Sequence, residues 1–145
     1  MLQKMRHRTL ATAAALLPLL LLAGCAGRGV ARIPEPPAQV AIVWKRTAME
    51  RPPLESVPQA LRAAAPREWL RASYQSYATV VLVDIYRMPS AASAFEALQR
   101  WRTEPGAAAF AHGELLVVCS SPMETTQGLI DFSAKLEAEW LGTGR

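Results

Sequence analysis

Two apolar segments with alternating side chains dominate the middle of the chain. Residues 69–75 and 78–88 flank a polar break at Gln75 and Ser76, which predicts a β-hairpin. In the second segment, both sets of alternating side chains are mostly apolar. Because successive side chains of a strand point to opposite faces, we expect a central strand that is covered at least partly on both faces.

A helical pattern follows this hairpin. Ser90 is a candidate N-cap, and Pro105 and Gly106 would end the helix. The spacing of the apolar residues places one group of them on a single helical face. This group consists of Ala94, Phe95, Leu98 and Trp101.

The pattern of hairpin and helix then repeats. Residues 107–121 contain two short apolar runs that meet at His112 and Gly113, and glycine accepts the positive φ that a tight turn needs. Ser121 and Glu124 have the spacing of a capping box, which predicts a helix that begins there and ends at Gly142. Its apolar stripe consists of Leu129, Phe132, Leu136 and Trp140.

The region before the first hairpin is less regular. Residues 39–47 contain a short apolar run that predicts a weak strand, and residues 49–66 contain four prolines. Only residues 59–65 are suited to a short helix, because proline disrupts helix interiors. We therefore expect residues 40–66 to form a segment that covers the open face of the sheet.

The order strand-strand-helix-strand-strand-helix predicts an α+β domain. We expect an antiparallel sheet of four to five strands with two helices packed on one face. The single domain would span residues 40–145, with residues 67–145 as its core. The stretch "YRMPSAASAFEALQRW" at 86–101 and the overall layout are similar to small uncharacterised domains of bacterial envelope proteins. This resemblance implies no activity.

The N-terminal segment has the layout of an export signal. Lys4, Arg6 and Arg8 precede an apolar run of 14 residues from Leu10 to Ala23, interrupted only by Thr12. As a helix this run would reach only about 21 Å, whereas the hydrocarbon core of a bilayer is about 30 Å thick. The run is therefore better suited to a signal than to a membrane span.

The end of the apolar run, Leu22-Ala23-Gly24-Cys25, resembles the lipobox of bacterial lipoproteins. The resemblance implies that residues 1–24 are removed and that Cys25 carries a diacylglyceryl group and an acyl chain. Several chains hold a protein on a membrane far better than one. Ala26 stands where an inner-membrane retention signal of this family usually has Asp, which favours the outer membrane. The remaining alternatives are a plain secretory signal and an uncleaved anchor.

Removal of the signal changes the charge. The full chain has a formal charge of +4, but three of its 16 Lys and Arg residues lie in the signal, which leaves 13 against 12 acidic residues. This balance gives no electrostatic basis for binding nucleic acid. Residues 25–39 are rich in Gly, Ala and Pro and predict a flexible tether with a reach of about 40 Å.

Candidates for chemistry are few. With Cys25 lipidated, Cys119 has no disulfide partner, and its apolar surroundings favour a core residue. If His112 and Cys119 lay on one strand, seven residues would place them about 23 Å apart on opposite faces, too far for a nucleophile and base. We expect His112 to be a solvated turn residue. The residue types show no metal-ligand or phosphate-loop pattern, so no metal or cofactor is expected beyond the lipid on Cys25.

A partner surface is the other candidate. Asp84 stands inside an apolar strand, where either a salt bridge to Arg71 or a ligand contact would explain it. Aromatic residues and Arg are enriched at binding hot spots. The partner-binding candidates on the sheet face left open by the helices are Trp69, Arg71, Tyr74, Asp84 and Tyr86. The alternative is that residues 40–66 bury this face as a second core layer.

These inferences together predict a lipid-anchored envelope protein that acts as a non-catalytic binding or scaffolding module. Its expected partners are the membrane, reached through the anchor, and a protein of the envelope, with the outer membrane facing the periplasm as the favoured location. The alternative function is that of a small hydrolytic enzyme that uses Cys119.

Overall fold

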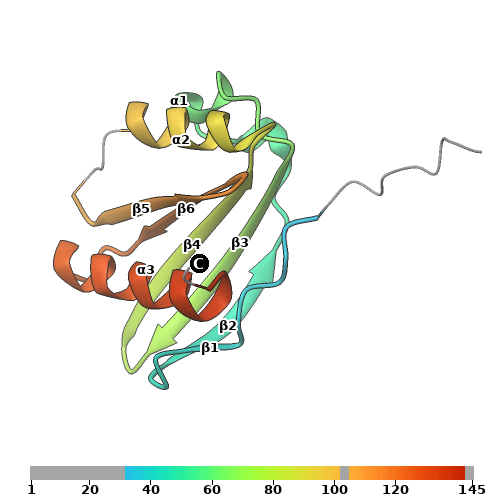
Figure 1. The fold of residues 1–145 in the computed structure, drawn as a ribbon. Coiled ribbons are helices and arrows are strands. Elements are labelled where there is room, and N and C mark those ends of the chain that lie inside the picture. Colours follow the sequence, from blue (N-terminus) through green and yellow to red (C-terminus); the bar gives the residue numbers. More distant parts are fainter. Residues whose placement is uncertain (1–31, 102–104, 143–145) are drawn as a thin grey trace, which may run out of the picture. The chain divides into compact units, whose positions relative to one another are not determined.

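Six antiparallel strands form one sheet in the computed structural model, which describes residues 32–101 and 105–142 (Figure 1). The spatial order is β1-β2-β3-β4-β6-β5. The strands are β1 (Gln39–Val40), β2 (Trp44–Glu50), β3 (Glu68–Ser76), β4 (Thr79–Arg87), β5 (Ala107–His112) and β6 (Leu115–Ser120). The α+β class and the antiparallel sheet are confirmed, with more strands than expected. The proposed signal, residues 1–24, lies outside the described residues.

The central hairpin of β3 and β4 is confirmed. Its strands pair without interruption from Glu68↔Arg87 to Ser76↔Thr79. The turn lies at Tyr77 and Ala78, two residues later than expected, and Tyr77 has a left-handed φ of 52°. Strand β4 lies between β3 and β6 in the sheet. Most of its side chains are buried on both faces, as its apolar pattern predicted, because a separate group of side chains covers each face.

The two long helices lie on opposite faces of the sheet, so the prediction that both pack on one face is wrong (Figure 1). Helix α3 (Thr126–Trp140) and helix α2 (Ala91–Arg100) pack against alternate residues of β4. The α3 side includes Val81, Val83, Ile85, Leu129, Phe132 and Leu136. The α2 side includes Tyr86, Met88, Ala94 and Ala97. A sheet that is apolar on both faces needs a cover on each of them.

The helix ends show how local capping signals compete. Ser90 caps α2 as predicted, because its hydroxyl oxygen accepts from the Ser93 N–H at 3.1 Å. Helix α3 begins later than predicted, since Thr125 and not Ser121 is its N-cap and accepts from the Gly128 N–H at 3.0 Å. The Ser121 hydroxyl instead accepts from the Met123 N–H, in a turn before the helix.

The apolar faces of the helices differ from expectation at one position. Leu129, Phe132 and Leu136 of α3 are buried, as their spacing predicted. On α2, however, Phe95 is 58% exposed. The buried α2 face uses Ala94 and Ala97, with Leu98 and Trp101 packed at its margin.

Residues 40–66 take two different roles. Residues 39–47, expected as one strand, divide into β1 and the start of β2 around a turn in which Ala41 and Ile42 have φ of 48° and 64°. Strand β2 then pairs with β3 and widens the sheet. The following segment contains the short helices η1 (Leu54–Ser56) and α1 (Gln59–Arg62), and its Val57 and Leu61 pack on the face that carries α2.

Candidate functional site

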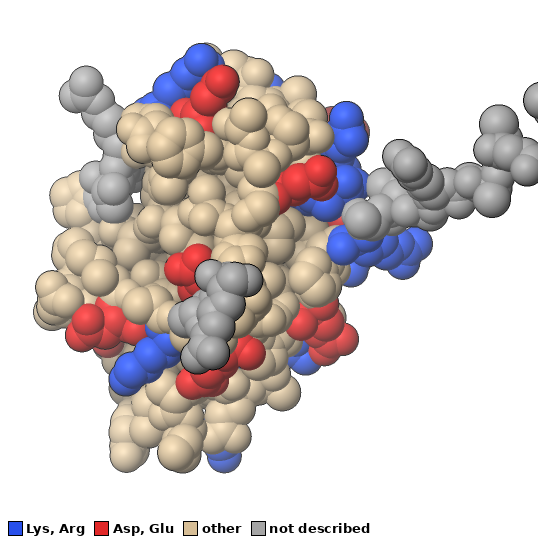
Figure 2. Space-filling view, viewed as in Figure 1, with Lys and Arg blue, Asp and Glu red and all other residues tan. Residues whose placement is uncertain are grey.

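The surface shows no large area of a single charge on the face drawn in Figure 2, where acidic and basic side chains lie close to one another. Several charged residues are paired within the domain, such as Arg46 with Glu35 and Arg51 with Glu68. A candidate site therefore has to be sought in particular side-chain clusters and not in the overall field of the domain.

Four of the five predicted partner-binding residues lie together. Arg71 stands directly opposite Asp84 on the central hairpin, and Trp69 stands opposite Tyr86. All four are on the face that carries α2, since β3 and β4 alternate their side chains in register. The fifth residue, Tyr74, lies on the opposite face with α3.

Asp84 is held by a charged and an aromatic neighbour. The Arg71 Nε donates to Asp84 Oδ1 at 2.8 Å and its Nη2 to Oδ2 at 3.2 Å, and the Trp69 indole N–H donates to Oδ1 at 2.8 Å. The prediction of a salt bridge for Asp84 is confirmed. The hydrogen bond to Asp84 raises the pKa of Arg71, and the guanidinium lies 5.1 Å from the centre of the Trp69 ring.

Most of this cluster belongs to the core. Trp69 is 5% exposed, Tyr86 1% and Asp84 8%, and the two aromatic rings stack with centroids 5.5 Å apart. Residues of the η1 and α1 segment pack over the rings. Only Arg71 reaches the surface, where Glu50 lies 3.8 Å from its Nη1. The arrangement therefore supplies hydrogen-bond donors to the buried Asp84 carboxylate. Of the four side chains, only Arg71 is accessible enough to contact a partner.

Tyr74 instead fixes the N-terminal segment. The ring is fully buried and meets Phe132 edge to face at 5.5 Å, and the hydroxyl donates to the Pro37 carbonyl at 2.6 Å. Burial raises the pKa of this phenol. Residues 32–39, expected as part of the tether, therefore pack along the domain. The remainder of the expected tether, residues 25–31, lies outside the described residues.

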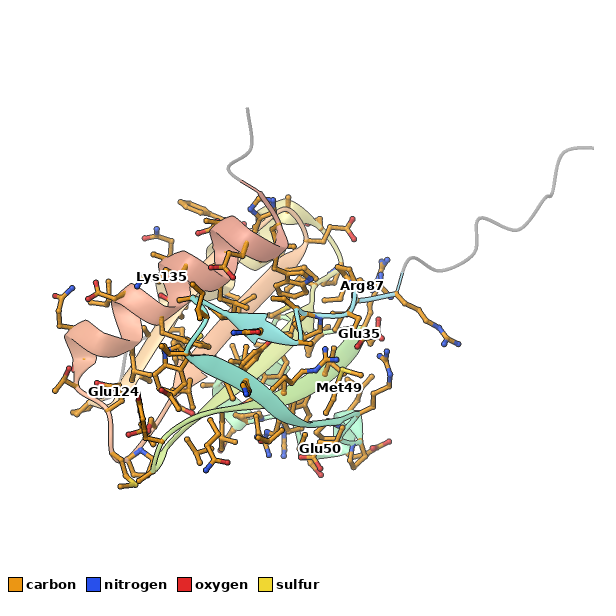
Figure 3. The ribbon with its side chains drawn as sticks, turned by 90° about the horizontal axis from the view of Figure 1, so that it is seen from below. Glu35, Met49, Glu50, Arg87, Glu124 and Lys135 are labelled. Carbon is orange, nitrogen blue, oxygen red and sulfur yellow. The ribbon has the colours of Figure 1, made fainter. Side chains whose placement is uncertain are left out.

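A second polar cluster holds the start of the described chain. Glu68 Oε2 accepts from the Ile33 N–H at 2.8 Å and lies 3.5 Å from the Nε of buried Arg87. The Glu68 carboxylate also pairs with Arg51. Figure 3 shows Arg87 and Glu35 at the end of the domain where this segment enters. With Ile33 only 3% exposed, the cluster fixes where the chain enters the domain.

Cys119 and His112 do not form a catalytic pair. The β5–β6 hairpin places Cys119 opposite Ala108 and His112 opposite Leu115. Both therefore lie on the α3 face and not on opposite faces, but four residues along the strand separate them by about 13 Å. His112 is the last residue of β5 and not a turn residue, and its Nδ1 lies 3.2 Å from Glu137 Oε1 while the side chain remains 32% exposed. Cys119 is completely buried, and burial raises the pKa of its thiol.

An exposed apolar area that the sequence analysis missed lies at the far end of the central hairpin. The β1–β2 turn carries Ile42 and Val43, which are 83% and 52% exposed, and the β3–β4 turn carries Tyr77, which is 91% exposed. Together with Lys45, Thr47 and Gln75 they line a surface hollow of about 510 Å³. We call these six residues the turn surface. The sequence suggested only a strand here, because the apolar run gave no signal of the turn.

Comparison with known proteins gives no independent assignment of a family or a function. No protein-family model, no curated protein and no solved structure matches the chain. Within the described parts of the chain, no group of three or more His, Cys, Asp or Glu side chains could hold a metal ion. No helix among the described residues is long and apolar enough to cross a membrane.

Replacing Asp84 by Ala should destabilise the domain, because it leaves the Arg71 guanidinium and the buried Trp69 N–H without their acceptor. We expect the free energy of unfolding in urea to fall by about 2–4 kcal/mol. The control Glu50→Ala removes the exposed partner of Arg71 and should cost no more than about 0.5 kcal/mol. Equal losses for the two variants would contradict this account of the cluster.

The Cys119 thiol should be unreactive while the domain is folded, because burial disfavours its thiolate. In a Cys25→Ser chain, where Cys119 is the only cysteine, maleimide labelling at pH 8 should be at least about a hundredfold slower than in concentrated urea. The rate is followed by mass spectrometry. Rapid labelling of the folded chain would contradict the role of Cys119 as a core residue.

Proposed function

We propose that this protein is a lipoprotein of the bacterial cell envelope, anchored through lipid on Cys25, and that its domain acts by binding another envelope protein. The observation that carries the proposal is the N-terminal sequence, in which basic residues, an apolar run of 14 residues and Leu22-Ala23-Gly24-Cys25 follow in order. Each part has its own physical role in export and anchoring.

The anchor and the domain would be joined by a short link. Residues 32–39 pack on the domain, so only residues 25–31 would remain between the lipid and the fold. Seven extended residues span at most about 25 Å. The domain would thus stay close to the bilayer, and Ala26 after the cysteine favours the outer membrane with the domain in the periplasm.

The turn surface is the best candidate for the binding area. The chain enters the domain beside Glu68, at one end of β3, while Tyr77 follows the other end of this nine-residue strand. The strand is about 30 Å long, which exceeds the reach of the link. The link is therefore too short for the lipid on Cys25 to reach the turn surface, whose exposed apolar side chains suit a protein partner.

Backbone conformation adds support for a role of this area. Ile42 has a φ of 64°, a left-handed conformation that a β-branched residue rarely adopts. Such conformations cost about 1–3 kcal/mol and persist where the surrounding structure fixes them, often at functional sites. In this left-handed turn the side chains of Ile42 and Val43 are exposed and not buried.

A test of the anchor compares the two cysteines of the chain. In cells, the native chain should fractionate with membranes, and mass spectrometry should find an N-terminal peptide that starts at acylated Cys25. The Cys25→Ser chain should retain residues 1–24 and lack the acyl groups, whereas Cys119→Ser should be processed like the native chain. An intact N-terminus or a free thiol at position 25 in the native protein would refute the anchor.

A test of the binding area uses a photoreactive phenylalanine analogue at position 77 in living cells. We expect a cross-linked product with a protein other than this chain, and the yield should fall at least about tenfold with Ile42→Ser. The control Phe95→Ser removes an exposed apolar side chain from α2 and should leave the yield unchanged. A product pattern insensitive to Ile42→Ser would rule out the turn surface as the binding area.

A further inference from the structure

The outer edge of β5 is open to pairing at residues 109–112, which are partly exposed, whereas Ala107 is only 6% exposed. Strand β5 ends the sheet order and pairs only with β6 among the described strands. The Ser121 N–H donates to the Gly106 carbonyl at 3.0 Å, so Gly106 and every second residue after it bond to β6. The alternate residues direct their N–H and C=O groups outward. These residues are Ala107, Ala109 and Ala111.

This edge lacks the features that usually prevent strand pairing. The sequence of β5, Ala-Ala-Ala-Phe-Ala-His, contains no Lys, Arg, Asp, Glu or Pro, and its pairing with β6 has no bulge. The opposite edge is different, since β1 has only two residues and its neighbour β2 has an irregular register at Arg46 and Ala48. Proteins usually protect an open edge by such shortening, bulges or charges.

The helices beside this edge carry exposed apolar side chains. On α3, Ile130 is 46% exposed and lies on one stripe with Glu137, which contacts His112 of β5, so this stripe faces the edge. Helix α2 packs on β5 from the other face and carries exposed Phe95. In Figure 2, the middle of the face between these helices is mainly free of charged side chains.

We propose that two copies of this chain pair through β5 in antiparallel orientation and form one continuous sheet. The three outward residues are symmetric about Ala109, so Ala109 would face its own copy and Ala107 would face Ala111 of the other copy. Each such pair exchanges two backbone hydrogen bonds. A twofold axis midway between the two Ala109 residues therefore pairs every outward N–H and C=O group of the edge, as a self-complementary interface requires.

The available area agrees with a dimer. Six strand residues extend about 20 Å, and the helix, sheet and helix layers are about 30 Å thick together. The face thus offers about 600 Å² per copy, or about 1,200 Å² in total, which is the lower end of specific interfaces. The strand alone would be too small, so Ile130 and the flanking helices have to contribute. The proposal rests on the fold and is independent of the lipid anchor.

The test uses the full chain in mild detergent, with its mass measured by analytical ultracentrifugation across a dilution series. We expect a dimer that dissociates on dilution, and Ala111→Lys should raise its dissociation constant at least about tenfold. The matched control Ala48→Lys places the same side chain at an exposed alanine of β2 and should leave the constant unchanged. A chain that stays monomeric up to about 0.5 mM would overturn the proposal and leave the edge to a foreign strand.

Hydrogen exchange of the unmodified chain gives a second measurement that does not depend on a variant. In the dimer, the amides of Ala109 and Ala111, which are partly exposed in the single chain, should exchange at least about a hundredfold more slowly than in the dilute monomer. The amides of Ala108 and Phe110, which bond to β6, should be protected in both states. A dimer whose outward amides exchange as fast as in the monomer would use another surface and would equally overturn the proposal.

Discussion

The apolar character of β4 and β6 on both of their faces is the constraint on which the rest of the structure depends. Val83 and Cys119 point toward α3, while Tyr86 and Leu116 point toward α2. Neither face can be left to water without loss of hydrophobic stabilisation. The chain meets this requirement with one long helix on each face, and the η1 and α1 segment completes the cover on the α2 side.

The same constraint explains the polar interior. Asp84 faces the α2 side of a buried strand, so its carboxylate requires donors within the fold. Arg71, opposite it on β3, and the Trp69 indole supply them. On the α3 side, the Glu68 carboxylate accepts from the Ile33 N–H and lies 3.5 Å from the Nε of buried Arg87. The ionisable residues that attract attention in the sequence are thus used mostly to hold the sheet and the N-terminal segment.

Because the interior is committed to packing, the two surfaces that we propose for interaction among the described residues are the turn surface and the β5 edge. They lie on different parts of the sheet, since four strands of the spatial order separate β1 from β5. The twofold axis of the proposed dimer would run perpendicular to the sheet, so the turn surfaces of the two copies would lie at opposite ends of the shared sheet.

The sequence by itself determined most of the helices and strands, because alternation, caps and turn residues act within a few residues of one another. The β3–β4 hairpin, the Ser90 cap and the buried stripe of Leu129, Phe132 and Leu136 follow from such local signals. Only the tertiary structure decided on which face each helix lies, because periodicity tells which side of an element is apolar but not what covers it. Strand alternation by itself places Tyr74 and Trp69 on opposite faces of β3, but only the tertiary structure shows that residues 32–39 pack on the domain and are not part of a tether. Long-range contacts, such as the hydrogen bond from the Tyr74 hydroxyl to the Pro37 carbonyl, decide how helices and segments pack, and a local sequence pattern does not encode them.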